Sequence, residues 1–115
     1  AGEPDLCFDI AHLEQVFWNL FRNATRYCQK RPGSIRVRAV AGVSRVDIDV
    51  ANDGPDIPVE LRSRLFEPFY TTDRAGTGLG LYLARELAEV NGASLSYVDI
   101  PDGAMFRLSC QPAPC

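Results

Sequence analysis

Three alternating glycines, in Gly76-Thr77-Gly78-Leu79-Gly80-Leu81, are the residues best suited to binding a phosphate group. Glycine leaves backbone N–H groups unshielded, so a bulky polyanion can approach them closely. An apolar-periodic run starts at Leu79 and stops at Asn91-Gly92, which predicts an amphipathic helix directly after the loop. Unpaired N–H groups at a helix N-terminus favour anions. Taken alone, the motif fits a tight turn before a buried helix equally well, because it is neither a Walker A loop nor a dinucleotide fingerprint.

Two asparagines, Asn19 and Asn23, could hold a metal ion. They stand four residues apart in the apolar-periodic stretch 10–28, so they share one face of a predicted helix. Asparagine is a poor residue in the middle of a helix, because its side chain competes for backbone groups. One interpretation is an amide pair that offers oxygens to Mg²⁺, with water and phosphate as the other ligands. The other is a solvated stripe shared with Arg22 and Arg26, and spacing alone leaves both open.

The stretch Asn52-Asp53-Gly54 ends a predicted buried strand, where the backbone can come close to a ligand. Either polar side chain could hydrogen-bond the edge of a nucleobase. The alternative is a plain tight turn, which this tripeptide suits well. The rest of the loop, to Pro58, is dense in turn-forming residues.

Residues 65–72, Leu-Phe-Glu-Pro-Phe-Tyr-Thr-Thr, place three aromatic side chains between a short helix and the glycine loop. One interpretation is a hydrophobic latch that fixes a loop to the core. The other is a nucleotide lid, covering about residues 67–75, with Thr71, Thr72 and Arg74 near the phosphates. Both can hold, because a lid needs an anchored hinge.

The elements that must position these residues can be read from periodicity. Asp9 is suited to cap the first helix. Alternating patterns around residues 35–39 and 46–50 predict a hairpin with one buried face. Further strands are expected at 6–8, on an edge, and at 95–100 and 104–110, and residues 60–66 form a short helix at most. The predicted fold class is α+β, an α/β sandwich with helices on one face of a mostly antiparallel mixed sheet.

The composition limits the classes of function. A chain of 115 residues with 46% hydrophobic and 23% charged residues is typical of one soluble globular domain. The net charge of -3 argues against nucleic acid and anionic membranes as partners. No run is long enough for a membrane span, and no signal peptide is evident. The four cysteines, Cys7, Cys28, Cys110 and Cys115, form no CxxC pair, and His12 is the only histidine. We therefore expect free thiols rather than a zinc site or a disulfide framework.

Taken together, the motifs resemble a known family. Residues 12–24 are similar to the N box, 52–58 to the G1 box, 65–72 to the F box and 76–81 to the G2 box of the catalytic and ATP-binding domain of sensor histidine kinases. The order and spacing of four motifs are far more specific than any one motif. The lid and the helix after it look most like nitrogen-regulation and pilin-regulation sensor kinases. The resemblance covers nearly the whole chain as a single domain, with residues 1–5 read as an expression remnant or the end of a linker and 112–115 as a frayed end.

The resemblance implies a Bergerat-type fold that binds Mg²⁺ and ATP between the helices and the lid. It implies that Asn23 coordinates Mg²⁺, with Asn19 close enough to take part. Related gyrase-like ATPases have a water-activating glutamate at the position of Asn19, and an amide cannot act as a base near neutral pH. Arg26 stands where the family usually has lysine and would reach phosphate, while Tyr27 would flank the adenine. The ATP-binding residues that the resemblance implies are Asn19, Asn23, Arg26, Tyr27, Asn52, Asp53, Gly54, Ile57, Phe69, Thr71, Thr72, Arg74, Gly76, Thr77, Gly78, Leu79, Gly80 and Leu81.

Two departures from the family pattern bear on affinity. Asn52 replaces the aspartate that usually opens the G1 box, and Asp56 replaces its second glycine. The resemblance implies a monomeric cytoplasmic domain, part of an inner-membrane sensor kinase, that transfers phosphate to a histidine on a separate dimerisation domain and so acts indirectly on a response regulator. The alternatives are a degenerate domain that serves as an interaction module and a self-contained gyrase-like ATPase.

Overall fold

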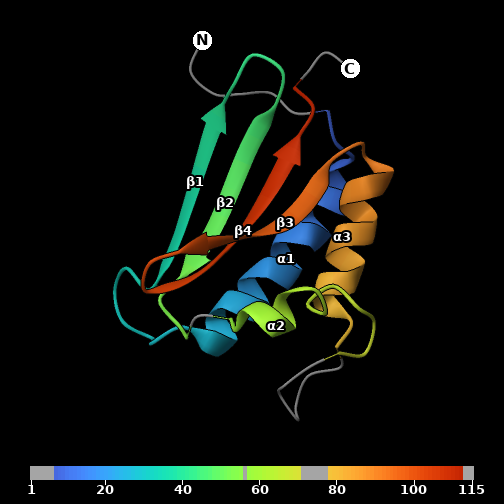
Figure 1. The fold of residues 1–115 in the computed structure, drawn as a ribbon. Helices are drawn as coiled ribbons and strands as arrows, with labels where there is room; N and C mark the ends of the chain where they lie inside the picture. The colour runs from blue at the N-terminus through green and yellow to red at the C-terminus, as the bar shows by residue number, and fades with distance from the viewer. Residues whose placement is uncertain (1–6, 56, 71–77, 113–115) are drawn as a thin grey trace.

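The computed structural model describes residues 7–55, 57–70 and 78–112, which form two layers (Figure 1). One layer is an antiparallel sheet in the strand order β1-β2-β4-β3, and the other holds the helices on one face of it. The elements in chain order are α1 (Ile10–Tyr27), β1 (Ile35–Ala41), β2 (Val46–Asn52), α2 (Val59–Arg62), α3 (Gly80–Val90), β3 (Ser94–Ile100) and β4 (Gly103–Cys110). The α+β class and the helix–sheet sandwich expected from the sequence are confirmed.

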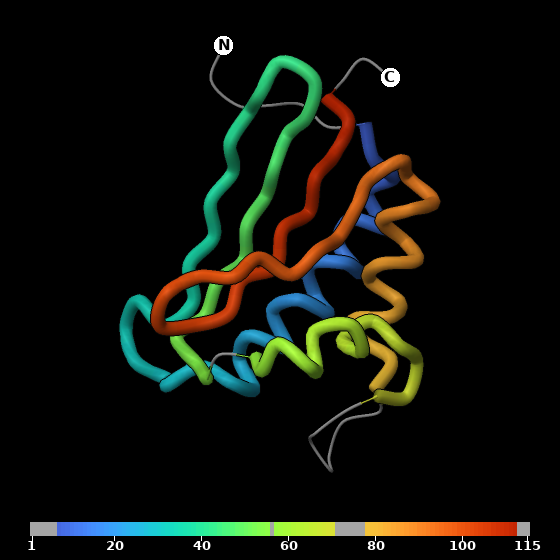
Figure 2. Tube along the Cα trace, in the orientation of Figure 1, coloured from blue at the N-terminus to red at the C-terminus, as the bar shows by residue number. Residues whose placement is uncertain are grey.

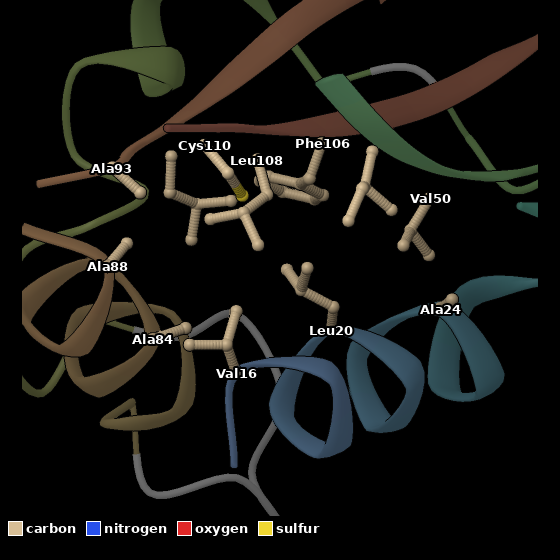
Figure 3. Packing of buried hydrophobic residues seen from close by; sticks show 12 residues of the cluster. Val16, Leu20, Ala24, Val50, Ala84, Ala88, Ala93, Phe106, Leu108 and Cys110 are labelled. Atoms are coloured by element: carbon tan, nitrogen blue, oxygen red, sulfur yellow. The ribbon is translucent and has the colours of Figure 1, made fainter. Parts of the chain in front are cut away.

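The core lies between α1, α3 and the inner face of the sheet (Figure 3). Alternate residues of β2 and β4 point inward, among them Val50 and Leu108, because strand side chains alternate between the two faces. Leu20 is the large side chain that α1 contributes. Ala84 and Ala88 of α3 are completely buried, and their small side chains allow the two helices to pack closely. Burial of these apolar groups is the main force that holds the helices on the sheet.

The start of α1 is joined to the end of α3. Asp9 caps α1, as expected, because its Oδ1 accepts the N–H of His12 at 3.0 Å. The backbone N–H of Asp9 in turn donates to Oδ1 of Asn91 at 2.9 Å, and Nδ2 of Asn91 donates to the carbonyl of Leu87 at 2.8 Å. Figure 2 shows the two chain segments side by side at this end of the molecule. The two helices therefore run in opposite directions from this contact.

The outer face of the sheet carries a row of charges across three strands. Asp49 of β2 stands opposite Arg38 of β1 and Arg107 of β4. Nε and Nη2 of Arg107 donate to the two carboxylate oxygens of Asp49 at 2.8 and 3.2 Å. Nη2 of Arg38 lies 3.6 Å from Oδ2 of the same carboxylate. Asp49 is only 3% exposed, so these guanidinium groups largely replace its water.

The structure corrects three expectations. The hairpin is present, but β1 does not share the buried face of β2, since Val37 and Ala39, which pair with the buried Val50 and Ile48, are exposed. Within the described part of the expected edge strand at 6–8, Cys7 and Phe8 are not in a strand, although the N–H of Cys7 donates to the carbonyl of Gln111 at 2.9 Å. Cys7 takes part in a disulfide, whereas Cys28 and Cys110 are free as expected. Among the described residues, no helix is long and apolar enough to cross a membrane.

Candidate functional site

The sequence motifs come together at one end of the molecule, the lower end in Figure 1. The C-terminal half of α1, the last residue of β2 and the first turn of α3 all lie there, and α2 lies beside them (Figure 1). The fold therefore unites the N box, the G1 box and the described part of the G2 box.

The two asparagines of α1 differ in their surroundings. Asn19 is buried, 9% exposed, and its Oδ1 accepts a hydrogen bond from Nε2 of Gln15 at 3.2 Å. Its Nδ2 is buried without any hydrogen-bond partner in the described part of the chain. Asn23, one turn later, is half buried, and within the described ranges its side chain forms no hydrogen bond. The amide oxygen of Asn23 is thus available to a hard cation.

Asn52 closes β2 on the inner face of the sheet, in phase with the buried Val46, Ile48 and Val50. It is 3% exposed, and its Oδ1 accepts the backbone N–H of Gly54 at 2.8 Å. A carbonyl oxygen has a second lone pair, so this contact leaves one acceptor position. A buried amide at the end of an apolar strand is placed to read a polar ligand.

Gly54 lies directly against the C-terminal end of α1. A β-carbon at this position would overlap the carbonyl oxygen of Tyr27 and come within 2.8 Å of Oδ1 of Asn52. Only glycine allows the G1 loop to approach the helix this closely. The contact brings Tyr27 and Asn52, which lie far apart in the sequence, to the same corner.

Asp53 points away from Asn52 and is engaged with the connection between α1 and β1. Its Oδ1 accepts the N–H of Gln29 at 2.8 Å, and its Oδ2 accepts from Oγ of Ser34 at 2.9 Å and Nε of Arg31 at 3.2 Å. The N–H of Gln29, aided by Ser34 and Arg31, lowers the pKa of the Asp53 carboxyl despite partial desolvation. These bonds account for both carboxylate oxygens, so Asn52 is the better candidate for reading a base.

A backbone hydrogen bond joins Phe69 of the F box to Gly78 of the G2 box. The N–H of Phe69 donates to the carbonyl of Gly78 at 2.8 Å. Both residues have positive φ, 67° and 75°, and a β-carbon on Gly78 would overlap the main chain of Phe69. Leu79 gives α3 no side-chain cap, which suits a helix start that receives an anion.

The expected latch is formed by Phe66 rather than Phe69. Phe66 packs edge-on against the core residue Phe106, with ring centroids 6.0 Å apart, whereas Phe69 is 75% exposed. Ile57 and Leu81 pack against the rim of the core. The remaining site residues expected from the sequence, Thr71, Thr72, Arg74, Gly76 and Thr77, lie outside the described residues, as does Asp56.

Arg26 is exposed on α1 and lines a shallow hollow of about 500 Å³ on the outer side of that helix. Trp18, Phe21 and Arg22 also line this hollow, whereas Asn19 and Asn23 do not. The described residues contain no cluster of three or more histidine, cysteine or carboxylate side chains that could bind a metal ion. The donors present therefore fit a cation that takes one amide oxygen from the protein and the rest from phosphate and water, as Mg²⁺ does.

Sequence reasoning missed Gln15, which holds Asn19, and the residues that hold Asp53. Gln15 precedes Asn19 by four residues, which is the spacing of side-chain pairs on a helix and could have revealed the contact. The bond between Ser34 and Asp53 extends the β1–β2 hairpin by one residue pair beyond Ile35 and Asn52, so the register of the hairpin could have revealed it.

Comparison with known proteins agrees with this geometry. The sequence profile of the family described as "Histidine kinase-, DNA gyrase B-, and HSP90-like ATPase" matches residues 8–114. The chain is similar to Sensor protein kinase PilS of Pseudomonas aeruginosa, with 40% identity over 114 residues that cover 95% of this chain and 22% of that protein. It is also similar to Sensory histidine kinase/phosphatase NtrB of Rhodobacter capsulatus, with 34% identity over 124 residues that cover 96% of this chain and 35% of that protein. The chain thus spans well under half the length of these curated relatives.

Two solved structures have the same fold. The catalytic domain of histidine kinase ThkA superposes with a TM-score of 0.80 at 33% identity, covering 91% of this chain and 69% of that one. Full-length ShkA, solved in complex with AMPPNP, superposes with a TM-score of 0.85 at 29% identity, covering 100% of this chain and 24% of that one. The four boxes, the fold that unites them and these matches agree. The chain belongs to the family of histidine kinase-, DNA gyrase B- and HSP90-like ATPases, and it is an ATP-binding domain of the two-component sensor kinase type.

Proposed function

We propose that this domain binds Mg²⁺ and ATP and presents the γ-phosphoryl group to a histidine on the dimerisation domain of the same kinase. The observation that carries the proposal is the burial of two carboxamides, Asn19 in the middle of α1 and Asn52 at the end of β2, in an otherwise apolar interface. Buried amides without a full set of partners are costly, so their retention indicates a polar ligand.

Each described part of the site has a role in this proposal. The N–H groups of the first turn of α3 receive phosphate oxygens. Asn52 accepts from the adenine amino group with its free lone pair, and Asn23 offers its amide oxygen to the metal ion. Mg²⁺, when bound, neutralises charge on the β- and γ-phosphates. The protein itself contributes positioning, because no side chain among the described residues of the site is placed to act as a base at Asn19.

The proposal extends to the rest of the kinase. For the whole protein, we propose a phosphoacceptor histidine on another domain, a cognate response regulator and a cytoplasmic position in an inner-membrane sensor. The similarity to sensor kinases supports these proposals. Because the only histidine, His12, lies in the first turn of α1 and contacts Asn91, the domain alone should neither autophosphorylate nor hydrolyse ATP appreciably. Incubation with γ-labelled ATP should yield no acid-labile phosphoprotein and no phosphate release above background.

The decisive test is titration of the domain with ATP by calorimetry, with and without Mg²⁺. We expect saturable binding that Mg²⁺ strengthens, and we expect Asn23→Ala to remove that gain without loss of fold. Thr25→Ala, on the outer side of the same helix, is the matched control and should keep it. Absence of binding at millimolar ATP would instead favour the interaction module, and phosphate release that Asn23→Ala abolishes would favour the self-contained ATPase.

A further inference from the structure

We infer that the outer face of α1 is a docking surface for an anionic lipid bilayer. The residues that line the shallow hollow on this helix form the surface, here called the basic-aromatic face: Trp18, Phe21, Arg22, Thr25, Arg26 and Lys30. The choice of a bilayer as the partner rests on the proposed position of the domain in an inner-membrane sensor, because the cytoplasmic leaflet of a membrane is anionic.

The basic-aromatic face lies on the side of α1 that is turned away from the sheet. Its members recur at steps of three and four residues from Trp18 to Arg26, which places them on one side of the helix. Val16, Leu20 and Ala24 of the same helix point into the core (Figure 3). The helix therefore has one apolar side that packs on the sheet and an opposite side that remains open to a partner.

Two aromatic side chains are exposed on this open side. Trp18 is 60% exposed and Phe21 is 37% exposed. The ring of Phe21 stacks on that of Phe17 with centroids 5.8 Å apart, and Phe17 packs against the core, so the position of Phe21 is fixed from below. Exposed tryptophan and phenylalanine on the outer side of an amphipathic helix are suited to the boundary between lipid headgroups and acyl chains.

The charges of the basic-aromatic face all have one sign. Arg22, Arg26 and Lys30 supply three cations, and none of the described residues that line the hollow is acidic. Glu14, the only acidic residue of α1, does not line it. The net charge of -3 for the whole chain thus conceals a local positive surface. Each such cation near an anionic bilayer strengthens binding by about fivefold, and long basic side chains can keep their charged ends at the phosphate groups.

The shape of the hollow favours a bilayer over a protein. The hollow is shallow, with a volume of about 500 Å³, and Trp18 projects from it into solvent. A protein partner must match such a contour with a complementary surface, whereas mobile lipids adapt to it. Asn19 and Asn23 do not line the hollow, so a bilayer docked there leaves the inner side of α1 accessible to nucleotide.

The test uses vesicles and the emission of Trp18, which is the only tryptophan of the chain and therefore reports on this face alone. Vesicles that mix phosphatidylcholine with phosphatidylglycerol should shift the emission to shorter wavelength and sediment the domain with them. Vesicles of phosphatidylcholine alone should do neither, and high salt should reverse both effects. If the mixed vesicles cause no shift and no sedimentation at low salt, the inference is wrong.

Substitutions then locate the contact, with vesicle sedimentation as the readout. Arg22→Glu removes one cation and adds an anion, so it should weaken binding about twentyfold, and Lys30→Gln should weaken it about fivefold. Trp18→Ala should weaken it about tenfold through the loss of apolar area. The matched control is Arg36→Glu, which makes the same change of charge at an exposed position on the opposite side of the sheet. Equal weakening by Arg36→Glu and Arg22→Glu would show that only the total charge matters, and it would overturn the assignment.

Two further results separate the alternatives. Polyglutamate, a soluble polyanion without acyl chains, represents an acidic protein partner and should leave the emission maximum of Trp18 unchanged. An equal blue shift with polyglutamate would assign the face to an acidic protein and exclude the bilayer. Trp18→Ala should keep the ATP affinity of the wild type. If the wild-type domain binds mixed vesicles but not ATP, the proposed function fails, and if it binds ATP but not vesicles, only the present inference fails.

Discussion

The carbonyl oxygen of Tyr27 occupies the space that a β-carbon on Gly54 would need. This contact fixes the distance between the end of α1 and the loop after β2, and with it the corner that holds Asn52. We expect Gly54→Ala to lower the free energy of unfolding by about 1–3 kcal/mol, since backbone must shift to admit the new atom. The measurement is the urea midpoint, followed by circular dichroism.

The matched control for this change is Gly80→Ala. A β-carbon on Gly80 meets no atom within 4 Å, and the residue lies in a helix, where alanine is favoured. This variant should be neutral or more stable by up to about 1 kcal/mol. Equal urea midpoints for Gly54→Ala and the wild type would contradict this prediction, because they would show that the backbone at this corner can shift at little cost in free energy.

The bonds of Asp53 predict a pH-dependent contribution to stability. Its pKa is lowered in the folded state from an ordinary value of 3.8, so folding favours the charged form. The contribution is fully present above that value and is lost as the pH falls through the lowered pKa. Asp53→Asn should therefore unfold at a lower temperature than the wild type near neutral pH, and the difference should shrink below about pH 3.8. Glu86→Gln, which replaces an exposed carboxylate on α3, is the control for the loss of one surface charge.

The charge row on the outer face of the sheet predicts unequal effects of its two arginines. Arg107 holds both oxygens of the buried Asp49, so Arg107→Ala leaves a desolvated carboxylate and should cost about 3 kcal/mol of unfolding free energy. Arg38 is 70% exposed and reaches one oxygen at 3.6 Å, so Arg38→Ala should cost less than about 1 kcal/mol. Chemical unfolding of both variants gives the comparison, and a larger loss for Arg38→Ala would contradict the assignment.

The free cysteines should differ in reactivity. Burial raises the pKa of the Cys110 thiol to about 11, whereas Cys28 is half buried and donates only a weak bond to the carbonyl of Thr25 at 3.6 Å. At pH 8 about one Cys110 thiol in a thousand is ionised, and it lies in the core. A thiol reagent should label Cys28 in the folded domain and Cys110 only after unfolding, as peptide mass spectrometry would show. Rapid labelling of Cys110 in the native state would indicate that the end of β4 opens.

Asn52 should limit affinity for the base. A charged acceptor strengthens a hydrogen bond by about 1 kcal/mol over a neutral one, so Asn52→Asp should tighten ATP several-fold. The amide of Asn52 can also turn its NH₂ toward the guanine carbonyl, which a carboxylate cannot do. The variant should therefore prefer ATP over GTP more strongly than the natural domain. Calorimetry with both nucleotides decides the point, and unchanged values would exclude Asn52 as the reader of the base.

Much of this architecture could be predicted because its signals are local. The apolar periods of α1 and α3, the alternation in β2 and the cap at Asp9 each depend on residues within a turn or two of one another. The motifs also identified Asn19, Asn23 and Asn52 as candidates. Periodicity shows which side chains share a face, but it does not show whether another element covers that face. That is why Val37 of the edge strand β1, which pairs with the buried Val50, is half exposed.

The sequence could not show which atoms of the site are already engaged. The oxygens of Asp53 bond to Gln29 and Arg31, 24 and 22 positions away, and these two pairings depend on how the connection between α1 and β1 folds back on the loop after β2. The disulfide of Cys7 likewise depends on the course of the folded chain. Long-range pairing of this kind follows from the tertiary structure, and local propensity does not encode it.

The packing of α3 on α1 through Ala84 and Ala88 also constrains how a signal can reach the site. Both alanines are fully buried, so sliding or separating the helices would open a void in a close-packed interior. The asparagines on α1 and the start of α3 thus belong to one rigid unit. If the proposed function holds, control of phosphoryl transfer would act by reorienting this unit toward or away from the target histidine, and the distance between the two helices would stay constant through the cycle.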